Sequence, residues 1–312
     1  MGTPDFAVES LRALVDGGYN VVGVITAPDK PAGRGQKLKP SAVKAFALER
    51  GLTVLQPEKL KDEVFISKLR SLKPDLQVVV AFRMLPEVVW NMPPLGTFNL
   101  HASLLPAYRG AAPLNWAIIN GEIESGVTTF KLQHEIDTGN IIFQEKTTIA
   151  PDDNVEVLHD KLMAIGARLV VQTVDVLADG DFEFVKQQDL IDQGIEPTPA
   201  PKIFKEDCRI DWNTDAVKIC NLVRGLSPYP AAWTNLVDAD GKEIMLKVFN
   251  VSVGETCNQV PGTIETDGKL YLGIASSNAW LRVNELQLSG KKRMKVDDFL
   301  RGFQNIGKCR AK

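Results

Sequence analysis

The residue types best suited to chemistry lie in the segment FNLHAS, where an asparagine and a histidine stand two positions apart. Because alternate side chains of a β-strand point to the same face, Asn99 and His101 would project together. An amide can hydrogen-bond an oxygen on which negative charge develops, and an imidazole can do the same or move a proton near neutral pH. The pair indicates a site that stabilises an oxyanion; the alternative is that both residues only satisfy buried hydrogen bonds.

A carboxylate follows in QHEIDTG, residues 133–139, which reads as a turn between two predicted strands. Asp137 could keep His101 charged or accept a proton from an amine. An Asx-turn without chemistry is the alternative interpretation. Between the two motifs, the prolines and Arg-Gly pair of SLLPAYRGAAP, residues 103–113, interrupt secondary structure where a ligand-binding loop is expected.

The elements that must position these residues follow a doubly wound α/β pattern, with a mostly parallel, Rossmann-like sheet. Short β-branched runs predict strands, and apolar residues at three- and four-residue steps predict helices. The predicted strands cover residues 19–28, 52–57, 76–82, 96–103, 126–133 and 140–149, and the predicted helices cover 41–51, 62–74 and 154–178. Asn99 and His101 then lie at the C-terminal edge of the sheet, where open α/β sheets bind their ligands.

The start of the chain departs from this pattern. A doubly wound domain is expected to open with a strand, yet Met1 is followed at once by Gly2-Thr3-Pro4-Asp5, which reads as a turn into a helix. Either the reading frame begins further upstream and encodes the first strand, or the sheet lacks a central strand. The first explanation is favoured.

A second domain follows a linker. We expect the α/β domain to cover residues 1–195, a linker rich in proline and charge to cover 196–212, and a smaller domain to cover 213–312. After a predicted helix at 214–226, the last domain holds short strand-like pieces separated by Gly, Asp and Asn. This spacing favours a small β-barrel.

Composition narrows the class of protein. An apolar content of 44% and a charged content of 24% are typical of a water-soluble globular chain. The net charge of −3 argues against general affinity for nucleic acid, so a polyanionic partner would need local basic patches. The four cysteines are widely spaced and fit no metal-ligand pattern. With no apolar run near 20 residues and no targeting signal at the N-terminus, we expect a cytoplasmic protein without a membrane span. With only three histidines, a histidine-rich metal site is not expected either, and we expect a monomer.

Several separated motifs, in order and at compatible spacings, resemble the signature of the folate-dependent formyltransferases. They are Asn99-Leu-His101, Ser103-Leu-Leu-Pro106, Arg109-Gly110-Ala-Ala-Pro113 and Asp137-Thr-Gly139. The resemblance runs from Gly2 to about residue 303 and implies an OB-like barrel as the second domain. It also implies that 10-formyltetrahydrofolate is the co-substrate and that an amine attacks the formyl carbon to give a tetrahedral intermediate. Asn99 and His101 would stabilise its oxyanion, and Asp137 would support His101 and remove the amine proton.

The resemblance further implies a set of folate contacts around the catalytic residues. They are Phe82, Met84, Ser103, Leu104, Leu105, Pro106, Arg109, Gly110, Thr138 and Gly139. Two positions depart from the pattern of many relatives: Arg83 stands in place of a glycine, and Glu135-Ile136 stands in place of Gly-Leu.

Two basic segments bear on the amine substrate. The loop at residues 27–41 carries Lys30, Arg34, Lys37 and Lys39 among prolines and glycines, and on composition alone it is a solvated loop. It resembles the loop with which one branch of the family grips the acceptor end of methionyl-initiator tRNA. Lys291, Lys292 and Arg293 form a second basic run in the C-terminal domain, consistent with phosphate contacts to tRNA.

Other functions remain possible at this stage. The same catalytic residues serve relatives that formylate an amino-sugar nucleotide or hydrolyse formyltetrahydrofolate. A nucleotide-dependent dehydrogenase would share the α/β pattern, but the chain lacks a Gly-x-Gly-x-x-Gly turn after an opening strand. A non-catalytic RNA-binding protein built around the barrel belongs to a different class.

Overall fold

The computed structural model describes residues 1–32, 37–180, 182–303 and 305–312. The chain divides into two compact units. The first comprises residues 1–111, 125–147 and 159–200, and the second comprises residues 112–124, 148–158 and 201–312.

A four-stranded sheet with the order β5-β6-β8-β9 organises the first unit. These strands are β5 (Gln77–Val80), β6 (Thr97–His101), β8 (Glu124–Lys131) and β9 (Ile141–Thr148). The central strand β6 runs parallel to β5 and antiparallel to β8. Phe98 and Leu100 on one face and Thr97 and His101 on the other are all buried, as expected for a strand covered on both faces.

Three shorter strand pairs complete the strands of this unit. β1 (Val24–Ile25) lies parallel to β4 (Val54–Leu55), and β2 (Lys30–Ala32) pairs antiparallel with β3 (Lys37–Lys39). β7 (Arg109–Gly110) lies parallel to β10 (Pro199–Ala200). The strand predicted at residues 19–28 is therefore much longer than the one observed.

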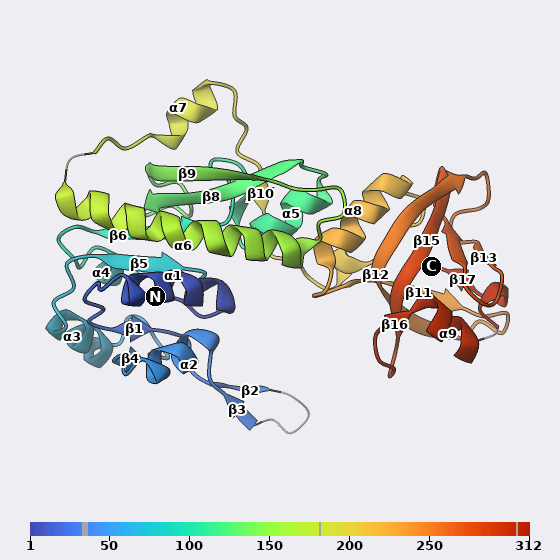
Figure 1. Cartoon of the computed structure of the whole chain (residues 1–312), viewed down its shortest axis with the longest axis horizontal. Coiled ribbons are helices and arrows are strands. Elements are labelled where there is room, and N and C mark those ends of the chain that lie inside the picture. The colour runs from blue at the N-terminus through green and yellow to red at the C-terminus, as the bar shows by residue number, and fades with distance from the viewer. Residues whose placement is uncertain (33–36, 181, 304) are drawn as a thin grey trace. The chain divides into compact units, whose positions relative to one another are not determined.

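Helices flank these strands. They are α1 (Asp5–Asp16), α2 (Ala42–Glu49), α3 (Glu63–Ser71), α4 (Glu87–Trp90), α6 (Val155–Asp179) and α7 (Gln187–Asp192). Ser41 and Asp62 cap α2 and α3 by accepting backbone N–H bonds of 3.1 and 3.0 Å, so both helices begin at polar residues suited to that role. Figure 1 shows α6 lying along β8 and β9, and the hydroxyl of Thr173 bonds that of Thr129 on β8 at 2.9 Å.

The second unit is a nearly closed antiparallel barrel with the strand order β13-β14-β15-β12-β11-β17. Its elements are α5 (Pro113–Ile119), the 3₁₀ turn η1 (Glu206–Cys208), α8 (Ala216–Leu226), β11 (Ala232–Val237), β12 (Glu243–Thr256), β13 (Ile264–Thr266), β14 (Leu272–Ala275), β15 (Ala279–Leu288), β16 (Met294–Lys295), α9 (Val296–Gly302), the 3₁₀ turn η2 (Ile306–Lys308) and β17 (Arg310–Ala311). A bridge between Thr263 and Arg310 joins the two edges of the sheet. The expected β-barrel is thus confirmed.

Alternating burial explains why these strands close around one core. β11 shows a strict period of two, with Ala232, Thr234 and Leu236 buried. Leu246, Leu281 and other apolar side chains of β12, β14 and β15 fill the interior together with Ile219 and Val223 of α8. In the described part of the chain, no helix has the length and apolar character needed to cross a membrane.

Candidate active site

The strand β6 holds the two central residues of the site. His101 is its last residue, and Asn99 lies two positions earlier on the same face. The register places Asn99 opposite Val79 of β5 and Phe130 of β8, while His101 lies opposite Thr128. Asn99 is half-buried and His101 is buried. Both side chains are therefore held by a strand with partners on either side, which limits their motion.

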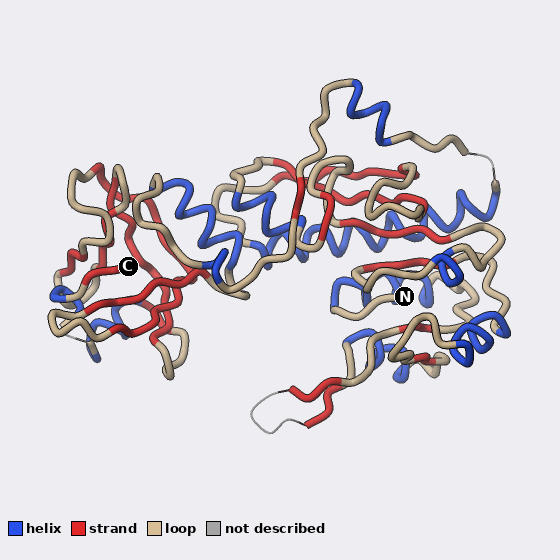
Figure 2. The backbone as a smooth tube through the Cα atoms, turned by 180° about the vertical axis from the view of Figure 1, so that it is seen from behind, coloured by secondary structure: helices blue, strands red, loops and turns tan. Residues whose placement is uncertain are grey.

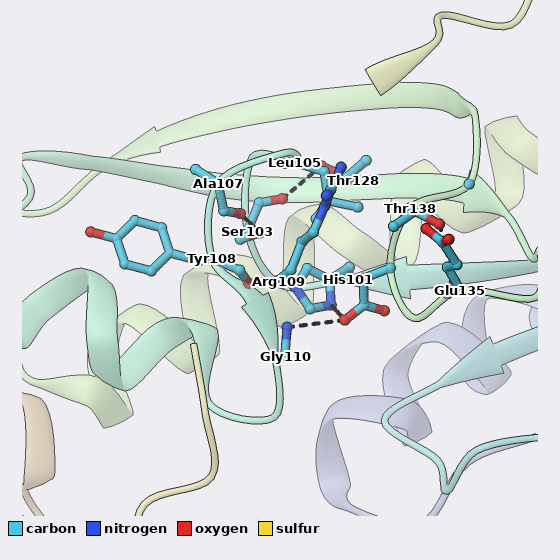
Figure 3. A network of polar contacts seen from close by, with 12 residues as sticks. His101, Ser103, Leu105, Ala107, Tyr108, Arg109, Gly110, Thr128, Glu135 and Thr138 are labelled. Atoms are coloured by element: carbon cyan, nitrogen blue, oxygen red, sulfur yellow. Dashed lines mark hydrogen bonds and ion pairs between the residues drawn. The ribbon is translucent and has the colours of Figure 1, made fainter. Parts of the chain in front are cut away.

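The imidazole of His101 has a defined hydrogen bond at one edge. Its Nε2 lies 2.9 Å from the carbonyl oxygen of Tyr108. Because a carbonyl oxygen only accepts hydrogen bonds, Nε2 must donate, and it carries a proton. The ring of Tyr108 points away from the imidazole (Figure 3). The Nδ1 edge is thereby left as the side of His101 that can act on a substrate.

Asp137 faces that Nδ1 edge. Its Oδ2 lies 3.9 Å from His101 Nδ1 and accepts a hydrogen bond of 3.0 Å from the backbone N–H of Gly110. Figure 3 shows this bond beside the imidazole. At 3.9 Å the two groups attract each other electrostatically without a direct hydrogen bond, so both retain capacity for a reacting group. The structure thus brings His101 and Asp137 together, and Asn99 lies on the same face of β6 as His101.

The turn that carries Asp137 is unusual in its backbone. Asp137 has φ of 55°, in the left-handed region that non-glycine residues adopt at some cost. A Cβ added at Gly139 would overlap the carbonyl oxygen of Lys131, so only glycine fits there. The hydroxyl of Thr138 donates to the carbonyl of Glu135 at 3.2 Å and closes the turn. The shape of this turn therefore requires Gly139, and the bond from Thr138 helps to hold Asp137 in place.

Sequence reasoning missed Gln187, the first residue of α7, which ties this turn to the neighbouring loop. Its side-chain amide donates to the carbonyl oxygens of Asp137 and Gly139, at 2.9 and 2.8 Å. Its Oε1 accepts bonds of 3.1 and 2.6 Å from the Nε and Nη2 atoms of Arg109. Gln187 is 3% exposed, so these bonds are shielded from water. Gln187 and Gln188 stand about 50 positions after the Asp-Thr-Gly motif, and nothing in that spacing could have identified Gln187 from the sequence.

The loop at residues 103–110 is held mainly by its own polar groups. Ser103 donates to the carbonyl of Ala107 at 2.7 Å, and the backbone N–H of Leu105 donates to Thr128 Oγ1 at 3.1 Å (Figure 3). Ser103 and Leu105 are both 1% exposed. These two side chains shape the loop from inside. Its last residues, Arg109 and Gly110, instead connect directly to Gln187 and Asp137.

The end of β5 presents the other expected ligand contacts. Phe82 and Met84 follow this strand beside β6, and Met84 is 71% exposed. Arg83 donates to the carbonyl oxygens of Glu58, at 2.7 Å, and Pro57. Arg83, which departs from the family pattern, is thus anchored to the segment at 57–58, and its guanidinium lies 5.7 Å from the centre of the Phe82 ring. Phe82 packs against the core, so Met84 is the more accessible of the two apolar residues.

The basic residues lie in both units. Lys30 and Lys39 pair in the register of the β2-β3 hairpin, with Lys37 opposite Ala32, and Arg34 lies outside the described residues. Lys291 and Lys292 are exposed, whereas Arg293 bonds Glu285 at 2.5 Å and its guanidinium lies 4.4 Å from the centre of the Phe249 ring. Within the described residues, no group of three or more His, Cys, Asp or Glu side chains could hold a metal.

A buried imidazole, a facing carboxylate and an amide at the C-terminal end of a strand define an α/β enzyme whose site can stabilise an oxyanion and move a proton. Comparison with known families identifies the class more closely. Residues 1–174 match the family described as Formyl transferase, and residues 202–304 match the family described as Formyl transferase, C-terminal domain. The chain belongs to the formyl transferase family.

Curated relatives match almost the whole chain. A methionyl-tRNA formyltransferase of Parabacteroides distasonis is 62% identical over 308 residues, which are 98% of this chain and 95% of the relative. One of Flavobacterium johnsoniae is 51% identical over 97% of this chain and 95% of the relative. These matches include both the catalytic segment and the barrel.

Solved structures share the fold at lower identity. The sugar 3N-formyl transferase WlaRD is 19% identical with a TM-score of 0.60, covering 93% of this chain and 97% of that one. An N-formyltransferase from Helicobacter canadensis is 20% identical with a TM-score of 0.62, covering 90% and 96%. HypX from Aquifex aeolicus in complex with tetrahydrofolic acid is 22% identical with a TM-score of 0.58, covering 83% and 43%. At these identities the likeness shows the fold alone.

Proposed function

We propose that this enzyme transfers the formyl group of 10-formyltetrahydrofolate to the α-amino group of methionyl-initiator tRNA, for the initiation of translation. The observation that carries the proposal is the 62% identity, over nearly the full length of both chains, to a protein named methionyl-tRNA formyltransferase. The site also supports it, because Asp137 faces His101 at the end of β6 and Asn99 lies on the same face of that strand, and these residue types have the chemistry that such a transfer needs.

The roles of the residues follow from their geometry. Attack of an amine on a formyl carbon places negative charge on the formyl oxygen, and the amide of Asn99 can donate to that oxygen. With Nε2 of His101 bound to Tyr108, the Nδ1 edge would donate when the ring is protonated. Asp137 faces the same edge of the ring and can accept the amine proton. Gln187 would act as a positioning residue, since it holds the backbone on both sides of Thr138.

Reduced folate, which supplies the formyl group, would bind where β5 and the loops end. The apolar side chains of Phe82 and Met84 suit a flat ring system, and the exposure of Met84 leaves it accessible. Arg109, Gly110, Thr138 and Gly139 would line the opposite side through the loops that Gln187 connects. Ser103, Leu104, Leu105 and Pro106 would contribute by fixing the loop. The complex of HypX with tetrahydrofolic acid supports a folate ligand for this fold.

The tRNA would meet basic side chains in both units. Lys30, Lys37 and Lys39 belong to the paired strands β2 and β3, and Lys291 and Lys292 belong to the barrel. Arg34, which stands between β2 and β3 in the sequence, lies outside the described residues. Arg293 would take part only by exchanging Glu285 for a phosphate. Contacts of this kind give an affinity that falls as salt rises.

We infer that the enzyme works as a monomer in the cytoplasm, where charged initiator tRNA is used.

A direct assay separates this function from its closest alternatives. Formyl transfer is measured with charged initiator tRNA, charged elongator tRNA and an amino-sugar nucleotide, each with 10-formyltetrahydrofolate. Rapid transfer to initiator tRNA alone supports the proposal. Transfer only to the sugar, or hydrolysis of the folate without an acceptor, would overturn it. Unchanged transfer by Asn99→Ala and His101→Ala would remove the proposed catalytic role.

A further inference from the structure

The β2-β3 hairpin, which carries Lys30 and Lys39, is joined to the rest of the first unit by two short connections. Figure 1 and Figure 2 show both strands extending away from the helices and other strands of this unit. β2 follows β1 through residues 26–29, and β3 leads into α2 through Pro40 and Ser41. The direction of the hairpin therefore depends on how these two connections are held.

Asp29, the residue just before β2, is held by two neighbouring side chains. Its Oδ2 accepts a bond of 2.6 Å from Lys44 Nζ on α2, and its Oδ1 accepts a bond of 2.8 Å from Nε2 of Gln56, the residue after β4. Gln56 Nε2 also donates to the carbonyl oxygen of Ala27 at 2.8 Å. The bonds from Lys44 and Gln56 lower the pKa of Asp29, so its carboxylate is charged at neutral pH. The entry to the hairpin is thus tied to both α2 and the end of β4.

The exit from the hairpin is tied to the same place. Thr26 Oγ1 lies 2.8 Å from Ser41 Oγ, and Ser41 is the residue that caps α2. Thr26 is buried, which shields this contact from water. Because Thr26 and Asp29 precede the hairpin while Ser41 and Lys44 follow it, two side-chain pairs bridge its base. A base held at two points limits the directions that the hairpin can take.

The segment after Gln56 connects this base to the sheet of the candidate site. The carbonyl oxygens of Pro57 and Glu58 accept bonds from Arg83, which follows β5. β5 is the parallel neighbour of β6, the strand that carries the catalytic residues. Hydrogen bonds therefore lead from Asp29 through Gln56 and the segment at 57–58 to the end of β5, and they give the hairpin a defined place relative to the site.

We propose that Asp29 is a positioning residue, which holds the lysines of the hairpin in the orientation that tRNA requires. This role rests on the proposed function, because it assumes that the hairpin binds tRNA phosphates. Asp29 itself does not suit a contact with the substrate, since a carboxylate repels phosphate groups and both of its oxygens are taken by Lys44 and Gln56. Its value to the enzyme lies in the bonds that fix the base of the hairpin.

Asp29→Leu separates positioning from direct electrostatics, because the two effects have opposite signs. The substitution removes a negative charge next to Lys30, so electrostatics alone would tighten binding and lower KM for charged initiator tRNA. Loss of both bonds would instead leave the hairpin poorly oriented. We expect KM to rise about fivefold or more while kcat stays within about twofold, because the catalytic residues are untouched. Steady-state kinetics at saturating 10-formyltetrahydrofolate provide the measurement.

Gln56→Met tests the same bonds without changing any charge. It removes the donor to Ala27 and Asp29, so KM should rise in the same direction and kcat should again be kept. This variant also decides the question should Asp29→Leu fail to fold.

Asp16→Leu is the matched control. Asp16 accepts a bond of 2.7 Å from Arg50 at the end of α2, so this variant also removes one carboxylate and its ion pair, but away from the hairpin. Its KM for charged tRNA should stay within about twofold of the parent value, because an exposed ion pair contributes little.

An unchanged or lower KM in Asp29→Leu and Gln56→Met would overturn the proposal, and so would an equal rise in Asp16→Leu. A loss of kcat with KM unchanged would indicate general damage to the fold and would also count against it. These failures leave the proposed function in place. Absence of tRNA formylation by the parent enzyme would instead overturn the proposed function and this role with it.

Discussion

The carboxylate of Asp137 is useful only in the position that its surroundings give it. Gly110 donates to Oδ2, Gln187 holds the carbonyl of the same residue, and the backbone is kept at φ of 55°. The side chain consequently faces His101 Nδ1 at 3.9 Å. Each of these constraints comes from a different part of the sequence, so the geometry depends on the folded chain around it.

Removing the amide of Gln187 tests this dependence. Gln187→Leu would leave the carbonyl groups of Asp137 and Gly139 and the guanidinium of Arg109 without their buried partner. We expect kcat to fall by about tenfold or more while KM for tRNA changes by less than about twofold. Steady-state kinetics over a range of pH provide the measurement, because a misplaced Asp137 should also change the shape of the kcat profile.

Gln188→Leu is the matched control, since Gln188 is exposed and bonds only Asp192, at 2.8 Å, among the contacts described. Its kinetics should equal those of the parent enzyme. Equal losses in both variants would indicate that α7 as a whole was damaged and would contradict a specific positioning role for Gln187.

Some of these site residues could be predicted from the sequence alone, and others could not. Asn99 and His101 are predictable because a strand has a period of two and both residues lie in one strand. Asp137 is predictable as a turn residue between strands. Gln187 is not, because its bonds to Gly139 and Arg109 span 48 and 78 positions of the sequence. Local periodicity carries no information about contacts at such separations.

Among the elements, the hairpin β2-β3 projects lysines from a short ladder. Lys30 pairs with Lys39, and the side chains of both residues are exposed. Two like charges at opposite positions repel each other, which disfavours the hairpin unless an anion lies nearby. This arrangement favours a phosphate-binding role over a purely structural one.

Replacing these two lysines should weaken tRNA binding in a salt-dependent way. For Lys30→Ala with Lys39→Ala, we expect the slope of log affinity against log salt to fall in magnitude by about 1 to 2, because each phosphate contact contributes about 0.7 to 0.9. Binding of charged tRNA between low and moderate salt gives the slope. Lys61→Ala, an exposed lysine outside the hairpin, serves as the control. An unchanged slope in the double variant would place the tRNA elsewhere.

Some predicted strands match the structure closely and one does not. The run at residues 76–82 became β5 and the run at 96–103 became β6, because both have neighbours along their length. The run at 19–28 formed a strand only at Val24–Ile25. Its apolar pattern is strong, but hydrogen bonding to a neighbouring strand decides whether a segment with that pattern becomes a strand. Residues 20–23 line a cavity of about 330 Å³ and have no strand partner among the described residues.

For the molecule as a whole, the buried amine of Met1 links stability to pH. Burial lowers the pKa of this amine from 8.0 to about 5. As pH falls from 8 towards 5, the unfolded chain takes up a proton that the folded chain does not, so the free energy of unfolding decreases. A difference of about three pKa units corresponds to about 4 kcal/mol, all of it lost by pH 5 and all of it present above pH 8.

Thermal unfolding between pH 5 and pH 8 measures this effect. The 312-residue chain should lose more stability on acidification than a chain in which an acetyl group or an added residue converts the amine to an amide. Tyr19, Lys73 and Asp75 line the same cavity as Met1 and are common to both chains, so the difference isolates the amine. Identical pH profiles for the two chains would contradict the buried position of Met1.

The central claim is that Asp137, with Asn99 and His101, carries formyl transfer to the amino group of methionyl-initiator tRNA. Single-turnover transfer by Asp137→Asn tests it most directly, because the amide keeps the size of the side chain and removes its charge and its ability to accept a proton. The account predicts a rate at least about 100-fold below that of the parent enzyme, with the Kd for charged tRNA within about twofold. A rate equal to that of the parent enzyme would contradict it.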